Sequence, residues 1–210
     1  MNNISPKSAL VSLSDKTNLD LLISFLLERN VEIISTGGTY KAIKKITDNV
    51  IEVSEYTGHK EMMDGRVKTL HPKIHAGILA RRGEDTDVLK SMDYKEIDIV
   101  VVNLYPFEET IKSGCSFEEA IEQIDIGGPT MIRAAAKNFK DVLVLSDPND
   151  YEEMISEWNS KNGISYEFRK KQATKVFKKM SQYNRAIHQY IDSENDENVI
   201  MDLSNPKVLR

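Results

Sequence analysis

Residues 97–103 read Ile97-Asp98-Ile99-Val100-Val101-Val102-Asn103, the strongest strand pattern of the chain. The run is apolar on both faces, as expected of a central strand in a parallel sheet that helices cover on both sides. Residues 141–145 form a second strand of the same kind. The two runs predict a sheet that is buried on both faces.

The segments before and after this strand alternate between β-branched runs and amphipathic helical patterns. Such alternation, with right-handed crossovers, predicts an α/β fold with a doubly wound, mostly parallel sheet. A long irregular segment, residues 54–82, is expected to be functional. Further strands are expected at residues 9–13, 31–35 and 50–53. Helices are expected at 17–29, from about 40, at 116–123 with a Ser116/Glu119 capping box, at 129–138, and at 166–191 packing back on the sheet.

Composition narrows the class of protein. The 210 residues are enough for one large domain, or for one domain with an appendage, and the formal net charge of −5 argues against a general nucleic-acid binder. Cys115 is the single cysteine, so the chain cannot form an internal disulfide or a cysteine zinc cage. There is no run of about 18 apolar residues and no signal-peptide core. We therefore expect a cytoplasmic protein that neither spans a membrane nor binds nucleic acid.

Polar residues follow the first two predicted strands, where ligands bind in open α/β sheets. Lys16 follows the first strand, and Gly37 and Gly38 follow the second at the start of a helix. Backbone N–H groups exposed by these glycines would form a phosphate cradle, although a tight glycine turn is the alternative. The pattern is neither a Walker loop nor a dinucleotide fingerprint.

The stretch Gly65-Arg66-Val67-Lys68-Thr69-Leu70-His71-Pro72 places two cations between a glycine and a proline. Arg66 and Lys68 would point to the same side of an extended chain, where an anion would meet them. His71 and His75 are four residues apart, but the HExxH glutamate is missing and Pro72 disturbs the turn, so no metal site is expected. We expect His71 to hold the shape of the loop.

Two further strand-end motifs carry chemistry. Asn103 and Tyr105 are two residues apart and could face one pocket, or Tyr105 and the following proline could form a rigid turn. Asp125 precedes a glycine pair that opens a helix whose free N–H groups could bind an oxyanion. An ordinary helix cap is the simpler explanation of Asp125. That explanation leaves both the glycine pair and Lys137 unexplained.

Taken together, these motifs resemble those of the IMP cyclohydrolase family, the amino-terminal half of a bifunctional enzyme that also carries AICAR transformylase. The resemblance covers residues 9–190 and implies a methylglyoxal synthase-like three-layer sandwich, with a mostly parallel sheet and C-terminal helices. It implies a domain over residues 1–192 and a linker over 193–210 toward an absent transformylase domain. Two local departures are Asn18 for a common glycine and His59-Lys60 for a common Phe-Pro. The motifs are residues 12–17, 35–39, 65–72, 103–107, 125–128 and 133–138.

The family's reaction closes FAICAR (5-formamidoimidazole-4-carboxamide ribonucleotide) to IMP with loss of water, and requires no metal or cofactor. The resemblance implies that Lys68 and Tyr105 orient the base, while Asp125 and Lys137 act as an acid/base pair. It also implies a purine nucleotide as the small-molecule partner, and a homodimer. The predicted substrate contacts are Ser12, Ser14, Lys16, Ser35, Thr36, Gly37, Gly38, Thr39, Arg66, Thr69, Asn103, Ile126, Gly127 and Gly128.

Within that set, the first two strand ends and Arg66 are expected to hold the phosphate. Backbone N–H groups of Ile126 and Gly127 are the predicted oxyanion hole, and Asn103 is expected to contact the carboxamide. Two alternatives have the same fold. One is a regulatory module that binds a phosphorylated ligand, as in carbamoyl-phosphate synthetase, and the other is methylglyoxal synthase acting on a triose phosphate. A regulatory module would need the phosphate cradle but not the four reacting residues together.

Overall fold

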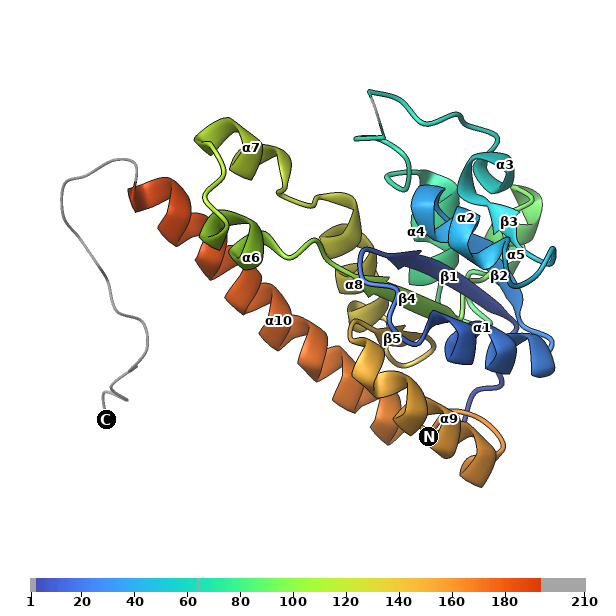
Figure 1. Cartoon of the computed structure of the whole chain (residues 1–210). Coiled ribbons are helices and arrows are strands. Elements are labelled where there is room, and N and C mark those ends of the chain that lie inside the picture. The colour runs from blue at the N-terminus through green and yellow to red at the C-terminus, as the bar shows by residue number, and fades with distance from the viewer. Residues whose placement is uncertain (1–2, 64, 194–210) are drawn as a thin grey trace, which may run out of the picture.

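A computed structural model describes residues 3–63 and 65–193. Its centre is a sheet of five strands, all parallel, in the order β3-β2-β1-β4-β5 (Figure 1). The strands are β1 (Ser8–Leu13), β2 (Glu32–Ser35), β3 (Ile51–Glu52), β4 (Ile99–Asn103) and β5 (Leu143–Leu145). The predicted α/β class and parallel sheet are confirmed. Residues 97–103 contain β4, an interior strand between β1 and β5, while β1 is the middle strand of the five.

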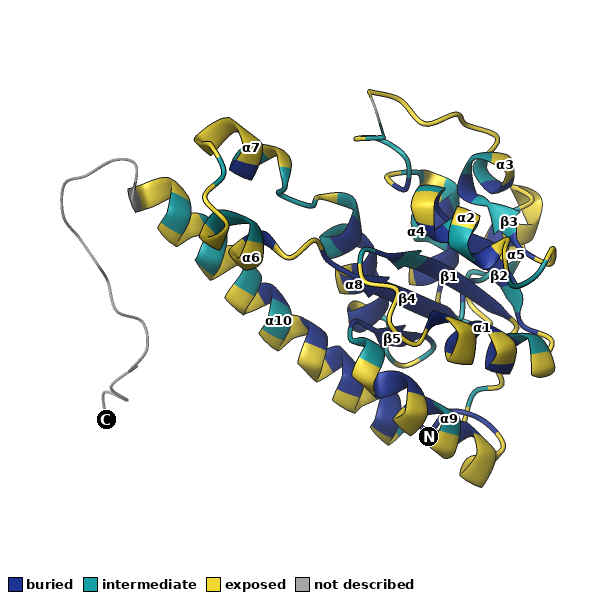
Figure 2. Ribbon diagram, viewed as in Figure 1, coloured by how far each residue is buried: buried dark blue, intermediate teal, exposed yellow. Residues whose placement is uncertain are grey.

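Helices cover both faces of the sheet and make the three layers (Figure 2). One face packs against α1 (Leu19–Glu28), α2 (Gly37–Ile43) and α9 (Tyr151–Lys161). The other face packs against α3 (Val53–Thr57), α4 (Pro72–Leu79), α8 (Gly127–Lys137) and α10 (Tyr166–Ser193). Alternate residues of β1 enter the two cores, with Ala9 and Val11 on one side and Leu10 on the other. This explains why the central strands are apolar on both faces.

Several predicted boundaries needed correction. The second helix begins at Gly37 rather than near residue 40, and the third strand is shortened to two residues because Val53 already starts α3. Residues 54–82 are not irregular throughout, since they contain most of α3 and all of α4. Helix α9 was not predicted, although its Trp158 packs edge-on against Phe25 of α1. The Ser116/Glu119 capping box is present at α7 (Phe117–Glu122), as predicted.

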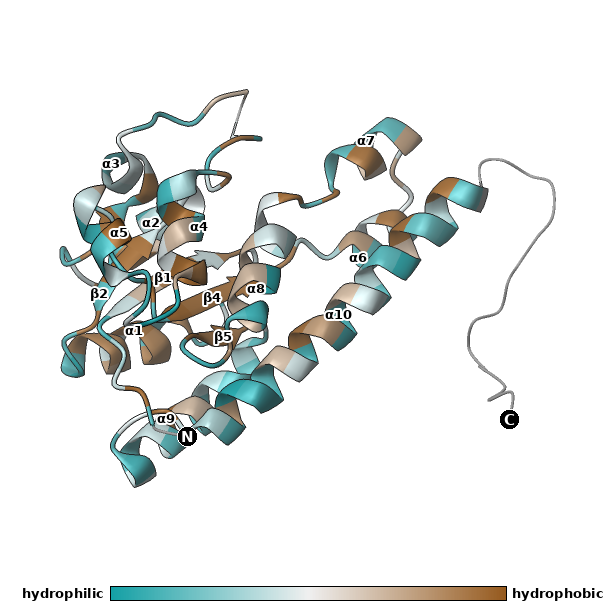
Figure 3. Cartoon of the chain, turned by 180° about the vertical axis from the view of Figure 1, so that it is seen from behind, coloured by the Kyte–Doolittle hydropathy of each residue, from teal (hydrophilic) through white to brown (hydrophobic). Residues whose placement is uncertain are grey.

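Helix α10 packs along the sheet domain with its first half and extends beyond it with its second half, where it meets α6 (Phe107–Lys112) (Figures 1 and 3). Arg169 anchors the first half: it is 1% exposed and donates hydrogen bonds to the carbonyls of Phe139 (3.0 Å) and Lys140 (2.7 Å). The predicted packing of this helix on the sheet is confirmed. The short helix α5 (Thr86–Ser91) and the 3-10 helix η1 (Pro148–Asp150) complete the described elements, and the predicted linker lies beyond them except for Ser193.

Over residues 3–63 and 65–193, no helix is both long and apolar enough to cross a membrane.

Candidate active site

Four hydroxyl groups join the carboxyl ends of β1 and β2 and the start of α2. The Thr39 hydroxyl accepts from the Leu13 N–H (2.8 Å) and lies 3.0 Å from the Leu13 carbonyl, to which it donates. Ser35 donates to the carbonyl of Val11 at 2.8 Å, and Ser12 shares a 2.7 Å hydrogen bond with Thr36. Ser35 and Thr39 are buried, so their side chains hold the start of α2 in place.

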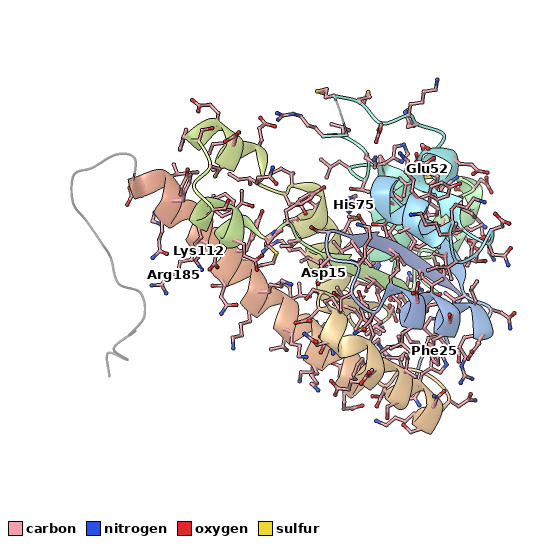
Figure 4. The ribbon with its side chains drawn as sticks, in the orientation of Figure 1. Asp15, Phe25, Glu52, His75, Lys112 and Arg185 are labelled. Carbon is pink, nitrogen blue, oxygen red and sulfur yellow. The ribbon has the colours of Figure 1, made fainter. Side chains whose placement is uncertain are left out.

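Asn103 at the end of β4 holds the turn that follows β1. Its side-chain oxygen accepts from the N–H groups of Ser14 (2.6 Å) and Asp15 (3.0 Å), and its amide donates to the Asp15 carbonyl (2.6 Å). Figure 4 marks Asp15 on that turn. Three of the four hydrogen bonds that an asparagine side chain can make are therefore used within the protein. These hydrogen bonds give Asn103 a positioning role at this turn, and its predicted contact with a substrate carboxamide stays a prediction.

Lys16 lies exposed at the same turn, and its ammonium group is 3.3 Å from the carbonyls of Leu13 and Ser14. The residue two places later, Asn18, has a left-handed backbone with φ of 59°. Glycine adopts this conformation without strain, and asparagine is among the few other residues that tolerate it. The departure from the family's glycine therefore preserves the backbone at this position.

The loop of residues 65–72 contacts both glycine pairs. A Cβ added to Gly37 would lie 2.9 Å from Lys68 Nζ, and one added to Gly127 would lie 2.9 Å from Thr69 Oγ1. Because Lys68 and Thr69 are adjacent in sequence, the loop bridges the start of α2 and the start of α8. Lys68 also forms an ion pair with Glu61, and this hydrogen bond lowers the pKa of the Glu61 carboxyl.

The two cations of this loop are placed differently from the prediction. Arg66 forms an ion pair with Glu122 of α7 and has an exposed side chain, whereas Lys68 lies against Gly37. The phosphate contact of Arg66 stays a prediction, and in this structure Lys68, rather than Arg66, lies at the Gly37 turn. The reason is that Glu122 offers Arg66 a carboxylate on the neighbouring helix.

His71 shapes the end of the loop, as predicted. Its Nδ1 accepts a hydrogen bond from the Lys73 N–H (3.1 Å) and so caps α4, while its ring lies 4.8 Å from that of His59. Burial lowers the pKa of His75, labelled on α4 in Figure 4. Among the described residues, no group of three histidine, cysteine, aspartate or glutamate side chains is placed to hold a metal ion.

Asp125 lies at the start of α8, where two hydrogen bonds hold it, one through its carboxyl group and one through its backbone N–H. Its Oδ1 accepts from the Gly128 N–H at 2.9 Å, as a helix cap would, and its own N–H donates to the Tyr183 hydroxyl at 2.8 Å. Burial raises the pKa of this carboxyl, against the opposing effect of hydrogen bonds from the backbone of Gly128 and Gly127. The carboxylate thus lies against the Gly127 N–H, one of the two groups predicted to form the oxyanion hole; the other is the N–H of Ile126.

Tyr183 is a site residue that the sequence patterns did not indicate. It belongs to α10, 58 positions along the chain from Asp125. A tyrosine on one face of an amphipathic helix gives no signal beyond packing. The remaining exposed members of the predicted site are Tyr105 and Ile126, which are 54% and 59% exposed on the loops before α6 and α8.

Lys137 is not part of this cluster. It is the last residue of α8 and is exposed, whereas Asp125 precedes the first turn of the same helix. A helix of 11 residues spans about 16 Å. Within this chain the helix therefore places Asp125 and Lys137 at opposite ends of α8. Their action as an acid/base pair stays a prediction.

Comparisons with known proteins match this arrangement. The MGS-like domain family matches residues 19–130, and the AICARFT/IMPCHase bienzyme family matches residues 135–210. The bifunctional purine biosynthesis protein PurH of Clostridium acetobutylicum is 54% identical over 88% of this chain, and that of Fusobacterium nucleatum is 54% identical over 90%. The chain spans 38% of the length of each of these two relatives.

The crystal structure of ForH superposes on the chain with a TM-score of 0.75 at 32% identity, covering 87% of this chain and 97% of that one. The MGS-like family match extends over more than half of the chain and includes both glycine pairs and the loop between them. Its fold class agrees with the parallel, helix-covered sheet described above. The chain therefore belongs to the MGS-like domain family.

Proposed function

We propose that this domain is an IMP cyclohydrolase, which closes FAICAR to IMP with loss of water. The observation that carries the proposal is the loop of residues 65–72, in which Lys68 contacts the Gly37 turn and Thr69 contacts the Gly127 turn. One loop thereby joins a cationic phosphate cradle to a buried carboxyl group. The bienzyme family match and the purine-biosynthesis relatives support this assignment over a regulatory module or methylglyoxal synthase.

In this reaction the carboxamide nitrogen attacks the formyl carbon of the same molecule, and a C–N bond forms. The formyl oxygen becomes the hydroxyl of a tetrahedral carbinolamine and then leaves as water, with both of its protons coming from nitrogen. An amide nitrogen is a weak nucleophile, but the two groups are neighbours on one imidazole ring. The protein's work is therefore to select the reactive rotamer, move protons and stabilise charge on the oxygen.

Lys68 is the cation in the best position to serve the anionic substrate. Its ammonium group lies at the Gly37 turn, where the phosphate is expected. The next residue of the same loop, Thr69, lies against Gly127, two residues after Asp125. The ion pair with Glu61 holds this side chain in place. We assign Lys68 to charge stabilisation between phosphate and base, with the exposed ring of Tyr105 orienting the base.

Asp125 is our candidate for proton transfer at the formyl oxygen. Burial raises its pKa, which brings a carboxyl group closer to the working range of a general acid or base. Its hydrogen bond with the Gly128 N–H aims the carboxylate along the start of α8. The Gly127 and Gly128 N–H groups would keep donating hydrogen bonds to the carboxylate and so stabilise its ionised form.

Mixing this chain with FAICAR and following the absorbance of IMP tests the proposal directly. We expect turnover that falls by about 10²–10⁴-fold in Asp125→Asn and persists in Asp20→Asn, which changes an exposed carboxylate in the first turn of α1. Saturable binding of FAICAR by calorimetry without IMP formation would favour the regulatory module instead. Turnover of a triose phosphate to methylglyoxal would contradict the assignment.

The cytoplasmic location and the homodimer remain predictions. Because the chain spans 38% of its curated relatives, the subunit arrangement of the whole protein is also a proposal. Sedimentation equilibrium of this chain at several concentrations would distinguish a dimer from a monomer.

A further inference from the structure

Helix α10 reaches the candidate active site through a single hydroxyl group. Tyr183 of this helix accepts a hydrogen bond from the Asp125 N–H at 2.8 Å. The tyrosine is only partly exposed, and burial raises the pKa of its hydroxyl, which therefore stays protonated and neutral at physiological pH. A neutral hydroxyl can accept from the backbone and still offer its own proton to a neighbour.

Packing holds the Tyr183 ring in place. It makes an edge-to-face contact with Phe107 of α6, with ring centroids 6.3 Å apart and planes at 70°. It also packs against the apolar core between α8 and α10. Since Arg169 fixes the first half of the same helix to the sheet domain, the hydroxyl has little freedom to move away from Asp125.

The turn at Asp125 depends on the Tyr183 hydroxyl, because the other hydrogen bond at this turn comes from the Gly128 N–H of α8 itself. A Cβ on Gly128 would lie inside contact distance of Asp125 Oδ2 and 2.7 Å from Leu104 Cδ2, so the turn is closely packed on the α8 side. The Tyr183 hydroxyl supplies the opposing contact, on the backbone of Asp125. Asp125 is thus held on two sides: α8 contacts its carboxyl group, and α10 contacts its backbone.

We propose that Tyr183 is a positioning residue that acts through the Asp125 backbone to aim the Asp125 carboxyl group for ring closure. This inference rests on the proposed function, because it assigns a purpose to Asp125 in that reaction. The proposal makes α10 one of the elements that position the catalytic groups. A displacement of α10 would then change the catalytic geometry without touching the substrate.

The test compares Tyr183→Phe with Tyr190→Phe in the whole chain. Tyr190 lies on the same helix and also packs edge-on against Phe107, at 5.8 Å, so its replacement perturbs the same aromatic cluster. We expect kcat with FAICAR to fall by about 10- to 100-fold in Tyr183→Phe, the cost of a misplacement approaching 1 Å. KM should change less than about threefold, and Tyr190→Phe should remain near wild type.

Two further measurements separate positioning from a general loss of structure. Hydrogen exchange at the Asp125 amide, followed by NMR, should accelerate in Tyr183→Phe while amides elsewhere in α8 and α10 keep their protection. In an Asp125→Asn background, Tyr183→Phe should lower residual turnover by less than about threefold, because the two changes act through one group.

The proposal is overturned if Tyr183→Phe turns over at the wild-type rate, if the effects of the two substitutions multiply, or if protection falls along the whole of α10. Failure of the proposed function looks different. In that case the wild-type chain would not produce IMP, although faster exchange confined to the Asp125 amide would still report the Tyr183 contact. That combination would overturn the role in ring closure while leaving the structural link in place.

Discussion

Replacing Gly128 by alanine adds one methyl group at the most closely packed point of the candidate site. The new Cβ would lie 2.7 Å from Leu104 Cδ2 and closer still to Asp125 Oδ2. Real Cβ atoms do not approach other heavy atoms this closely, so either α8 or the Asp125 carboxyl group must move. Leu104 is 8% exposed and cannot turn into solvent without leaving a cavity. The carboxyl group is therefore the group expected to shift.

The size of the effect follows from three contributions. Losing the hydrogen bond between Asp125 and the Gly128 N–H removes a helix cap, which costs about 0.5–2 kcal/mol. Overpacking against Leu104 costs about 1–3 kcal/mol, and alanine's better helix propensity returns up to about 1 kcal/mol. Together these give a net loss of roughly 0.5–5 kcal/mol in the free energy of unfolding. For a chain of this size, that lowers Tm by about 1–20 °C.

Thermal and urea unfolding of Gly128→Ala should be measured beside those of Gly38→Ala. Gly38 is also the second glycine of a pair at a helix start, but a Cβ there would meet nothing within 4 Å. We expect Gly38→Ala to be neutral or to stabilise by up to about 1 kcal/mol. Equal unfolding midpoints for the two variants would refute the packing argument. Turnover by Gly128→Ala within tenfold of wild type would show that the Asp125 carboxyl group does not depend on this contact.

Three other outcomes are expected. Lys68→Ala should lower turnover of FAICAR by about 10²–10⁴-fold, while Lys73→Ala, on the neighbouring helix, should not; a loss within tenfold would remove Lys68 from the mechanism. Thr39→Val leaves the Leu13 N–H without its acceptor and should cost about 1–3 kcal/mol in urea unfolding, so an unchanged midpoint would contradict the role of that hydroxyl. Burial lowers the pKa of His75 in the folded state. The neutral imidazole therefore contributes its full stabilisation above about pH 6.5, the ordinary pKa of histidine. That stabilisation is lost as the pH falls from there toward the lower pKa of the folded state. Urea midpoints at pH 5.5 and 7.5 should therefore differ less in His75→Gln than in wild type.

The sheet was predictable because its signals are local. All five strands overlap the apolar runs that predict them, and the 97–103 run contains β4, an interior strand that is buried on both faces. The helix starts at Gly37 and Phe117 follow turn or cap residues that are visible in the sequence. Helix α9 was missed because its apolar residues, Tyr151, Met154 and Trp158, are few among many charged ones.

The partners of side chains at the site were harder to predict. Arg66 and Lys68 alternate along the chain, so the sequence indicates only that both could meet an anion. Their separation in the structure depends on Glu122 and Glu61, one of which lies on another element. Asn103 is placed by its sequence position as a substrate contact, yet its hydrogen bonds go to the Ser14–Asp15 turn, 88 or more positions away. Such contacts depend on the register of β1 and β4, which sequence patterns do not determine.

The separation of Asp125 and Lys137, in contrast, follows from helix geometry alone. A helix predicted over residues 129–138 already implies a rise of about 1.5 Å per residue, and so a distance well beyond the reach of an acid/base pair. Nearness in sequence is therefore not nearness in space for these two residues. The group that does touch the Asp125 backbone, Tyr183, comes from a helix 58 positions later. If Asp125 exchanges protons during ring closure, the groups of this chain that lie nearest to it belong to the start of α8, the 65–72 loop and α10.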